Sequence, residues 1–318
     1  MNLNLLFENL SNPALLFFFL GILAVLVKSD LEIPESSSKF ISLYLLLAIG
    51  FKGGQELAHS HQNEEIATAL MLGVGLAIII PVYAFCILKG KFGLQNAGAI
   101  AASYGSVSAV TFITAISFLE MESIHFSGHM VAVMALMEAP AIIVGVSLMS
   151  YFSKDKESRL KPAKIWSHSF TNGSVILILG SLFVGFVASE QQAEGIRPFT
   201  TDIFKGFLAV FLLDMGITSG KKISDFLRRG WFAFAFAILM PLFNGVLVAF
   251  GTGYLDMVVG DRFLFAILAA SASYIAVPAA MRLAAPNANP GLYLPMALAI
   301  TFPFNITLGM PIYMQIIQ

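Results

Sequence analysis

Long apolar runs separated by short polar segments recur along the whole chain. The runs lie at about residues 13–27, 38–50, 66–88, 94–119, 129–151, 171–188, 202–216, 231–250 and 263–283, and a last run extends from residue 292 to the C-terminus. A helix needs about 20 apolar residues to cross the hydrocarbon core of a bilayer. The pattern therefore predicts an all-α, multi-pass membrane protein with about ten transmembrane helices and almost no domain outside the membrane.

Two polar features predict where helices end. Residues 50–54 read Gly-Phe-Lys-Gly-Gly, which is typical of a helix C-terminus, so we expect the second span to end there. Lys89 and Lys91 follow the third run and predict a short basic loop before the fourth.

Two segments interrupt the apolar pattern at matching places. Residues 101–111 read Ala-Ala-Ser-Tyr-Gly-Ser-Val-Ser-Ala-Val-Thr, and residues 269–279, which lie 168 positions later, read Ala-Ala-Ser-Ala-Ser-Tyr-Ile-Ala-Val-Pro-Ala. Irregular backbone at membrane depth is tolerated only where protein or a water-filled cavity surrounds it. Paired interruptions of this kind indicate a transporter binding site. We therefore expect the fourth and ninth spans to break, with Gly105 and Pro278 permitting the breaks, and to meet at the bilayer midplane.

The two halves of the chain also repeat. At a constant offset of 166, five residues of the first half match five of the second: Lys39, Leu46, Leu47, Gly50 and Gly54 against Lys205, Leu212, Leu213, Gly216 and Gly220. Chance similarity between apolar helices is the alternative. The pattern predicts two repeats of five spans, residues 1–152 and 169–318, joined by a cytoplasmic linker at residues 153–168. Because five is odd, the second repeat enters from the opposite side, which makes it an inverted repeat.

Composition agrees with a membrane protein. The chain is 58% hydrophobic and 12% charged, whereas soluble domains carry about 25% charged residues. The net charge of −1 gives no indication of nucleic-acid binding. Cys86 is the single cysteine, which excludes disulfides within the chain and cysteine-based metal sites. No basic residue precedes Lys28, so we expect the first run to be a retained span rather than a cleaved signal peptide.

Lys and Arg residues predict the orientation. Most lie in loops that follow odd-numbered spans, whereas the other side carries only Lys52, Arg197, Lys205 and Arg262. The positive-inside rule makes the first side cytoplasmic and places both termini outside an inner (plasma) membrane.

The interrupted helices are suited to an anion. The N-terminal end of a half-helix carries partial positive charge and free N–H groups. Hydroxyls from both segments add small donors, so we assign substrate binding to the residues around the two breaks: Gly105, Ser106, Val107, Ser108, Ser273, Tyr274 and Ile275. The alternative is that the hydroxyls bond to helix carbonyls and only allow tight packing.

Two carboxylates lie in apolar surroundings, Glu138 and Asp214. Intramembrane ionisable groups are costly, so either is a candidate cation ligand or proton carrier. Asp214 is expected to lie close enough to the end of its span to reach water. The candidate cation ligands are Ser103, Thr111, Glu138 and Ser271. Asn244 and Asn305 are buried polar candidates of a kind that more often forms helix–helix hydrogen bonds.

Other chemistry is not indicated. The histidines lie near span ends, so we expect no metal site other than one for sodium. The chain contains neither a G-x-S-x-G nor an H-E-x-x-H pattern, and we expect it not to be an enzyme.

Several segments resemble the cyanobacterial sodium-dependent bicarbonate transporter (SbtA) family. The similar segments are residues 49–54, 105–108, 137–141, 215–216, 269–278 and, most specifically, residues 286–290, which read Pro-Asn-Ala-Asn-Pro. The resemblance implies ten spans in two inverted repeats, a core domain holding bicarbonate and sodium at the crossovers, and a gate domain that forms a homotrimer. It also implies a PII-like protein that binds the cytoplasmic face. The chain departs from that family in two ways. Tyr274 stands where the family has an acidic residue, and the linker between the halves is shorter than in many cyanobacterial members.

Three functional hypotheses follow. The first is secondary import of a small anion, bicarbonate first, coupled to sodium, by an elevator-like movement of the crossover domain against a fixed gate domain. The second is a cation–proton exchanger that uses Glu138 or Asp214. The third is a non-transporting membrane sensor, because Tyr274 makes the second crossover less polar.

Overall fold

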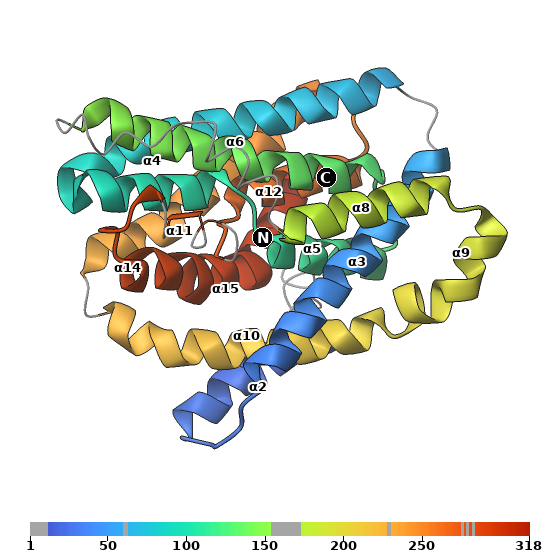
Figure 1. The fold of residues 1–318 in the computed structure, drawn as a ribbon, viewed down its shortest axis with the longest axis horizontal. Coiled ribbons are helices and arrows are strands. Elements are labelled where there is room, and N and C mark those ends of the chain that lie inside the picture. Colours follow the sequence, from blue (N-terminus) through green and yellow to red (C-terminus); the bar gives the residue numbers. More distant parts are fainter. Residues whose placement is uncertain are drawn as a thin grey trace.

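The computed structural model describes residues 12–59, 63–153, 173–227, 230–274, 277, 280–281 and 284–318. Within these residues every regular element is helical and there is no strand (Figure 1). Five helical stretches are long and apolar enough to cross a membrane: Glu65–Met121, His129–Phe152, Glu190–Lys222, Trp231–Tyr254 and Pro290–Ile317. Pro13–Leu26 and Ile176–Val187 are shorter apolar helices. The described part of the chain therefore has the build of an all-helical membrane protein.

The elements follow the chain in two groups. Before the linker region lie α2 (Pro13–Leu26), α3 (Glu35–His59), α4 (Asn63–Gly105), α5 (Ala109–Met121) and α6 (His129–Phe152). After it lie α8 (Gly173–Val187), α9 (Glu190–Arg197), η2 (Pro198–Asp202), α10 (Phe204–Leu227), α11 (Trp231–Gly251), η3 (Thr252–Tyr254) and α12 (Val259–Ala270). The last helical stretch comprises α14 (Pro290–Pro295), η4 (Met296–Thr301), α15 (Phe302–Phe304), η5 (Asn305–Gly309) and α16 (Met310–Ile317).

Residues 50–54 do not end a helix, so that prediction is wrong. α3 continues through them to His59. Gly50 and Gly54 instead face α8, where an added Cβ would overlap Ser181 and the carbonyl of Leu182. These glycines allow two helices to approach closely. In the sequence alone, glycines with this packing role look the same as glycines that end a helix.

The predicted loop at Lys89 and Lys91 is also wrong. Both lysines lie in helical backbone, and the chain turns at Gly93, which has φ 75° and ψ 167°. Glycine adopts positive φ without the steric penalty of a Cβ. The third and fourth spans therefore join through one residue inside α4.

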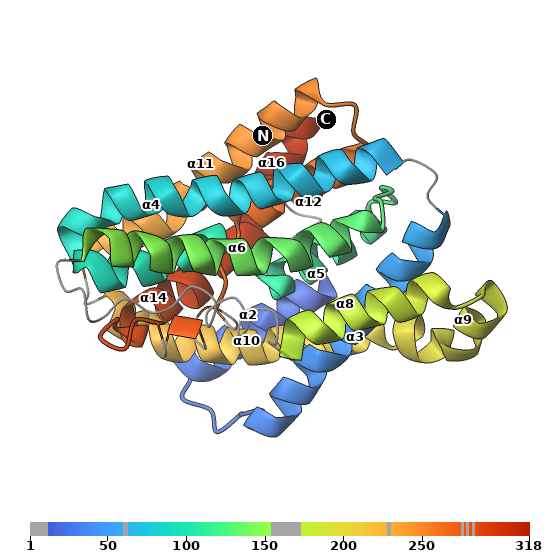
Figure 2. The ribbon, with the colours of Figure 1, turned by 45° about the horizontal axis from the view of Figure 1, so that its top comes forward.

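Four helix pairs form the most extensive contacts, two between the halves of the chain and two that each lie within one half. α2 packs against α10 and α3 against α8, whereas α4 packs against α6 and α11 against α12 (Figure 2). At the α2–α10 contact, an added Cβ on Gly21 would overlap the carbonyl of Leu213, and one on Gly216 would overlap the carbonyl of Phe18. The two backbones are thus in direct contact.

The chain breaks at both predicted places. α4 ends at Gly105 and α5 begins at Ala109, and α12 ends at Ala270 and is followed by the non-helical residues 271–274. Gly105 does not have the positive φ that would make glycine necessary for the break. It lies against the ring of Pro81, which an added Cβ would overlap, so its role is close packing. Pro278, Ile275 and the predicted linker beyond Ser153 lie outside the described residues.

We expect Gly216→Val to destabilise the protein, because the new side chain would collide with the backbone of α2. Overpacking of this kind costs about 1–3 kcal/mol. The measurement is thermal or denaturant unfolding in detergent. Gly206→Val, on the same helix with nothing within 4 Å of its added Cβ, is the matched control. Equal unfolding midpoints for the two variants would contradict the proposed backbone contact.

Candidate functional site

The two broken segments are hydrogen-bonded to each other. The Ser273 N–H donates to the Ser103 carbonyl at 2.8 Å, and the Ser103 Oγ donates to the Ser273 carbonyl at 2.5 Å. The Ser108 N–H donates to the Ser271 Oγ at 3.0 Å. The predicted meeting of the two interruptions is therefore present, and the backbone groups freed by each break are partly satisfied by the other.

Several hydroxyls at the two breaks form hydrogen bonds with the backbone. Ser108 is the N-cap of α5, and its Oγ accepts from the Thr111 N–H at 3.2 Å. The Ser271 Oγ donates to the Leu268 carbonyl at 3.0 Å. For Ser103 and Ser271 the structure thus shows the alternative role considered from the sequence, in which the hydroxyl bonds to main chain.

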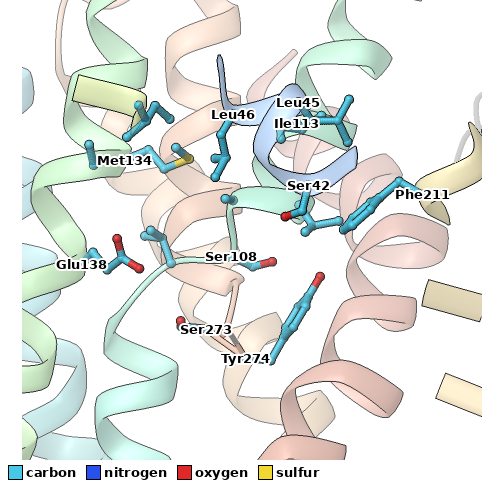
Figure 3. Close-up of a pocket in the computed structure, with 15 residues that line it drawn as sticks. Ser42, Leu45, Leu46, Ser108, Ile113, Met134, Glu138, Phe211, Ser273 and Tyr274 are labelled. Atoms are coloured by element: carbon cyan, nitrogen blue, oxygen red, sulfur yellow. The ribbon is translucent and has the colours of Figure 1, made fainter. Parts of the chain in front are cut away.

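Two buried hydroxyls, those of Ser106 and Tyr274, form no hydrogen bond of regular geometry to any described residue. Ser106 is 0% exposed and Tyr274 9%. The Tyr274 hydroxyl lies near Ser108 and points into the space beside it (Figure 3). Buried polar atoms are nearly always paired, so an unpaired hydroxyl directed into a cavity indicates a position for a ligand or water.

A cavity of about 40 Å³ lies beside the two breaks. Its walls come from four regions: Ser42, Leu45 and Leu46 of α3, Met134, Ala135 and Glu138 of α6, Ile178 and Phe211 of α8 and α10, and residues 107–110, 113, 273 and 274 of the crossovers (Figure 3). A water needs about 10–15 Å³ by this kind of measure, so the cavity has room for on the order of three waters. That is about the size of a small polyatomic ion.

The predicted substrate residues divide into two groups. Val107, Ser108, Ser273 and Tyr274 line the cavity, whereas Gly105 and Ser106 do not. Ile275 lies outside the described residues. Of the predicted cation ligands, Glu138 lines the cavity, and Ser103, Thr111 and Ser271 do not.

Sequence reasoning missed the opposite wall. Ser42 and Phe211 belong to α3 and α10, which are far from the crossovers in the sequence. Nothing in the local pattern distinguishes the face of these helices that borders a cavity from the face that borders lipid. Only the packing of distant segments reveals it.

Glu138 is the one charged side chain among the described residues that line the cavity. Its carboxylate is drawn at the α6 side of the cavity in Figure 3 and is partly buried. Within the described part of the chain it has no hydrogen bond or ion pair. A carboxylate in such a place needs a cation, a proton or water to compensate its charge.

Asp214 lies elsewhere. It is 7% exposed, and its carboxylate accepts a hydrogen bond from the Ser38 hydroxyl. Because the residue is buried, the expectation that Asp214 reaches water is wrong. Its charge is engaged between α3 and α10, and it does not line the cavity.

An ion pair joins α3 to the far end of α5. The Lys52 Nζ lies 2.6 Å from the Glu120 Oε1, and the Lys205 Nζ lies 3.9 Å from the Glu120 Oε2. Lys52 and Glu120 also border a second cavity, of about 240 Å³, with Glu56 and His125. The charged groups in this region are partly exposed. They give this second cavity a polar wall at the C-terminal end of α5, away from the crossover.

Comparison with known families gives one match. The family model described as the Na+-dependent bicarbonate transporter superfamily matches residues 13–318. The match thus spans all the helices described above. The comparison with curated proteins gives no match.

We expect Ser108→Ala to lower the free energy of unfolding by about 1 kcal/mol, because α5 would lose the side chain that caps its N-terminus. Ser108→Gly should cost only a few tenths of a kcal/mol, since glycine is itself tolerated at this position of a helix. Unfolding in detergent measures both variants. If Ser108→Ala unfolds like the wild type, the hydroxyl does not cap α5.

Proposed function

Because the chain belongs to the Na+-dependent bicarbonate transporter superfamily, we propose that it imports a small anion, bicarbonate first, together with sodium. The observation that carries this proposal is the cavity beside the two broken helices. It is bordered by the capped N-terminus of α5 and by the hydroxyls of Ser108, Ser273 and Tyr274. Membership of the family itself supports the transport of a small anion across a membrane.

The chemistry of the cavity favours a planar oxyanion. The N-terminal end of α5 carries partial positive charge, and an anion is stabilised there. The Tyr274 hydroxyl, which lies near Ser108, supplies a further donor at this end of α5. Bicarbonate has three oxygens around one carbon, and its size matches a space for on the order of three waters.

Glu138 supports coupling to a cation. An anion about 5 Å from an ionised carboxylate would be repelled by about 3 kcal/mol at an effective dielectric constant near 20. A sodium ion beside Glu138 removes this repulsion and makes anion binding depend on sodium. The proposal rests on Glu138 alone, because the Ser103 and Ser271 hydroxyls bond to main chain and Thr111 does not line the cavity. A proton on Glu138 would have the same electrostatic effect, and this keeps the cation–proton exchanger as the second candidate.

The helix contacts support ten spans in two inverted repeats, residues 1–152 and 169–318, with the linker at residues 153–168. If α2 corresponds to α8 and α3 to α10, exchanging the halves converts the α2–α10 contact into the α8–α3 contact. Both contacts are present and both rest on closely packed glycines. A pseudo-twofold axis between the halves accounts for this arrangement.

The position of the cavity supports an elevator-like movement. One wall belongs to α3, α8 and α10, and the other belongs to α5, α6 and the crossovers. We propose that the first group forms the fixed gate domain and the second group moves with the anion. The Lys52–Glu120 ion pair crosses the same boundary and would break during the movement.

Assembly and location complete the proposal. A homotrimer in the inner membrane, with both termini outside and a PII-like protein on the cytoplasmic face, follows from the resemblance and from the distribution of Lys and Arg.

Purified protein in liposomes should accumulate labelled bicarbonate when a sodium gradient is directed inward. Replacing external sodium with potassium should lower the initial rate at least tenfold. Uptake that is indifferent to sodium would remove the coupling, and no uptake under either condition would remove bicarbonate as the substrate.

We expect Glu138→Gln to weaken the sodium dependence of bicarbonate binding, because the neutral amide no longer repels the anion. The sodium concentration that gives half-maximal bicarbonate binding should change about tenfold or more, because the lost repulsion exceeds the 1.4 kcal/mol that corresponds to a factor of ten. Glu194→Gln, a change at a carboxylate with a 68% exposed side chain, is the control. If Glu138→Gln instead abolishes pH-dependent sodium movement in the absence of bicarbonate, the exchanger is the correct function.

A further inference from the structure

The last two carbonyls of α12 are each bonded by a buried asparagine. The Asn244 Nδ2 donates to the Ala269 carbonyl at 3.0 Å, and the Asn305 Nδ2 donates to the Ala270 carbonyl at 2.8 Å. These carbonyls have no partner within the helix, because the last four carbonyls of any helix lack one. Asn244 is 2% exposed and Asn305 is 0% exposed. The sequence-based expectation that both asparagines join helices is confirmed, and their target is the broken end of α12.

Two tyrosines fix the orientation of these amides. The Tyr83 hydroxyl donates to the Asn244 Oδ1 at 2.5 Å. The Tyr313 hydroxyl is 3.2 Å from the Asn305 Oδ1 and also 3.1 Å from the Pro241 carbonyl. An amide whose oxygen accepts from a hydroxyl must present its NH₂ group on the other side, toward the helix end. We call the four side chains of Tyr83, Asn244, Asn305 and Tyr313 the amide clamp.

The first crossover is held differently. At the end of α4, the Ala102 carbonyl accepts from the Ser106 N–H at 3.0 Å, and the Ser103 carbonyl accepts from the Ser273 N–H. Both donors are backbone groups. Aligning Pro81 with Pro241 places Ala84 opposite Asn244. Aligning Pro140 with Pro303 likewise places Ile142 opposite Asn305. The clamp is therefore a feature of the second half that the repeated architecture does not require.

The clamp has an electrostatic consequence for the neighbouring cavity. The C-terminal end of a helix carries partial negative charge and disfavours an anion. Ala270 is followed directly by residues 271–274, of which Ser273 and Tyr274 line the cavity. Two amide donors on the last carbonyls offset that charge where an anion has to approach.

We propose that Asn244 and Asn305 are positioning residues of the anion site. Their amides, held by Tyr83 and Tyr313, fix the backbone that leads from α12 to Ser273 and Tyr274 and screen the negative end of the helix. The inference rests on the proposed function, because it assigns these side chains to the binding of the transported anion. They do not touch the anion themselves.

Bicarbonate uptake by Asn244→Ala and Asn305→Ala in liposomes tests the proposal. Each variant should raise the half-saturating bicarbonate concentration about tenfold, as expected for one lost buried hydrogen bond, and change the maximal rate less than about twofold. Thr252→Val removes a buried hydroxyl just beyond the end of α11, away from the crossover, and should leave both values unchanged. A lower maximal rate with an unchanged half-saturating concentration would overturn the proposal.

A double-mutant cycle tests the role of the tyrosine. Tyr83→Phe alone should raise the half-saturating concentration, because Asn244 loses its orienting partner. In the Asn244→Ala background the same change should add nothing, since Tyr83 acts only through the amide. Additive effects of the two changes would overturn the clamp.

Hydrogen exchange tests, without any substrate, whether the amide clamp orders residues 271–274. In Asn305→Ala, amides of residues 271–274 should exchange about tenfold faster than in the wild type, whereas those of residues 106–108 should change less. If this result accompanies a wild-type protein that takes up no bicarbonate, the clamp stands and the proposed substrate fails. Unchanged or uniformly faster exchange refutes the clamp, whatever the transport result.

Discussion

Every polar backbone group at membrane depth has to find a partner inside the protein, and this requirement organises the structure. A helix that breaks in the apolar interior frees N–H groups on one side and carbonyls on the other. Here the freed groups of one break are satisfied in part by the other, through the paired bonds between Ser103 and Ser273 and the bond from Ser108 to Ser271. The meeting of the two breaks thus replaces the hydrogen bonds that water would otherwise provide.

Close helix contacts determine where the remaining space lies. Glycines on α2, α3, α8 and α10 bring backbones together, so these four helices form a tight layer. The cavity is left between that layer and the broken segments, where the side chains of Leu45, Ile113 and Phe211 limit its size. A site bordered by two packed bodies is reached from either side only if one body moves relative to the other, which relates the packing to the proposed transport mechanism.

The two breaks are similar in sequence but not in their partners. Backbone groups satisfy the end of α4, whereas asparagine side chains satisfy the end of α12. Glu138 adds a second difference, because its carboxylate comes from the first half and has no charged counterpart among the described residues that line the cavity. In the proposed function, the first half supplies the charge that a co-ion compensates, and the second supplies the wall that faces the anion.

The sequence by itself determined the helical class and the two places where helices break. These features depend on local composition: long apolar runs, and clusters of serine and other small residues that a lipid-facing helix does not carry. Only the tertiary structure decided that residues 50–54 continue a helix, that Gly93 rather than Lys89 and Lys91 makes the turn, and that Asp214 is buried against Ser38. It also decided which hydroxyls face the cavity and which bond to main chain, because the partner of a buried polar atom comes from a segment far away in the chain. Periodicity and composition describe a residue's neighbours in sequence and contain no information about that distant partner.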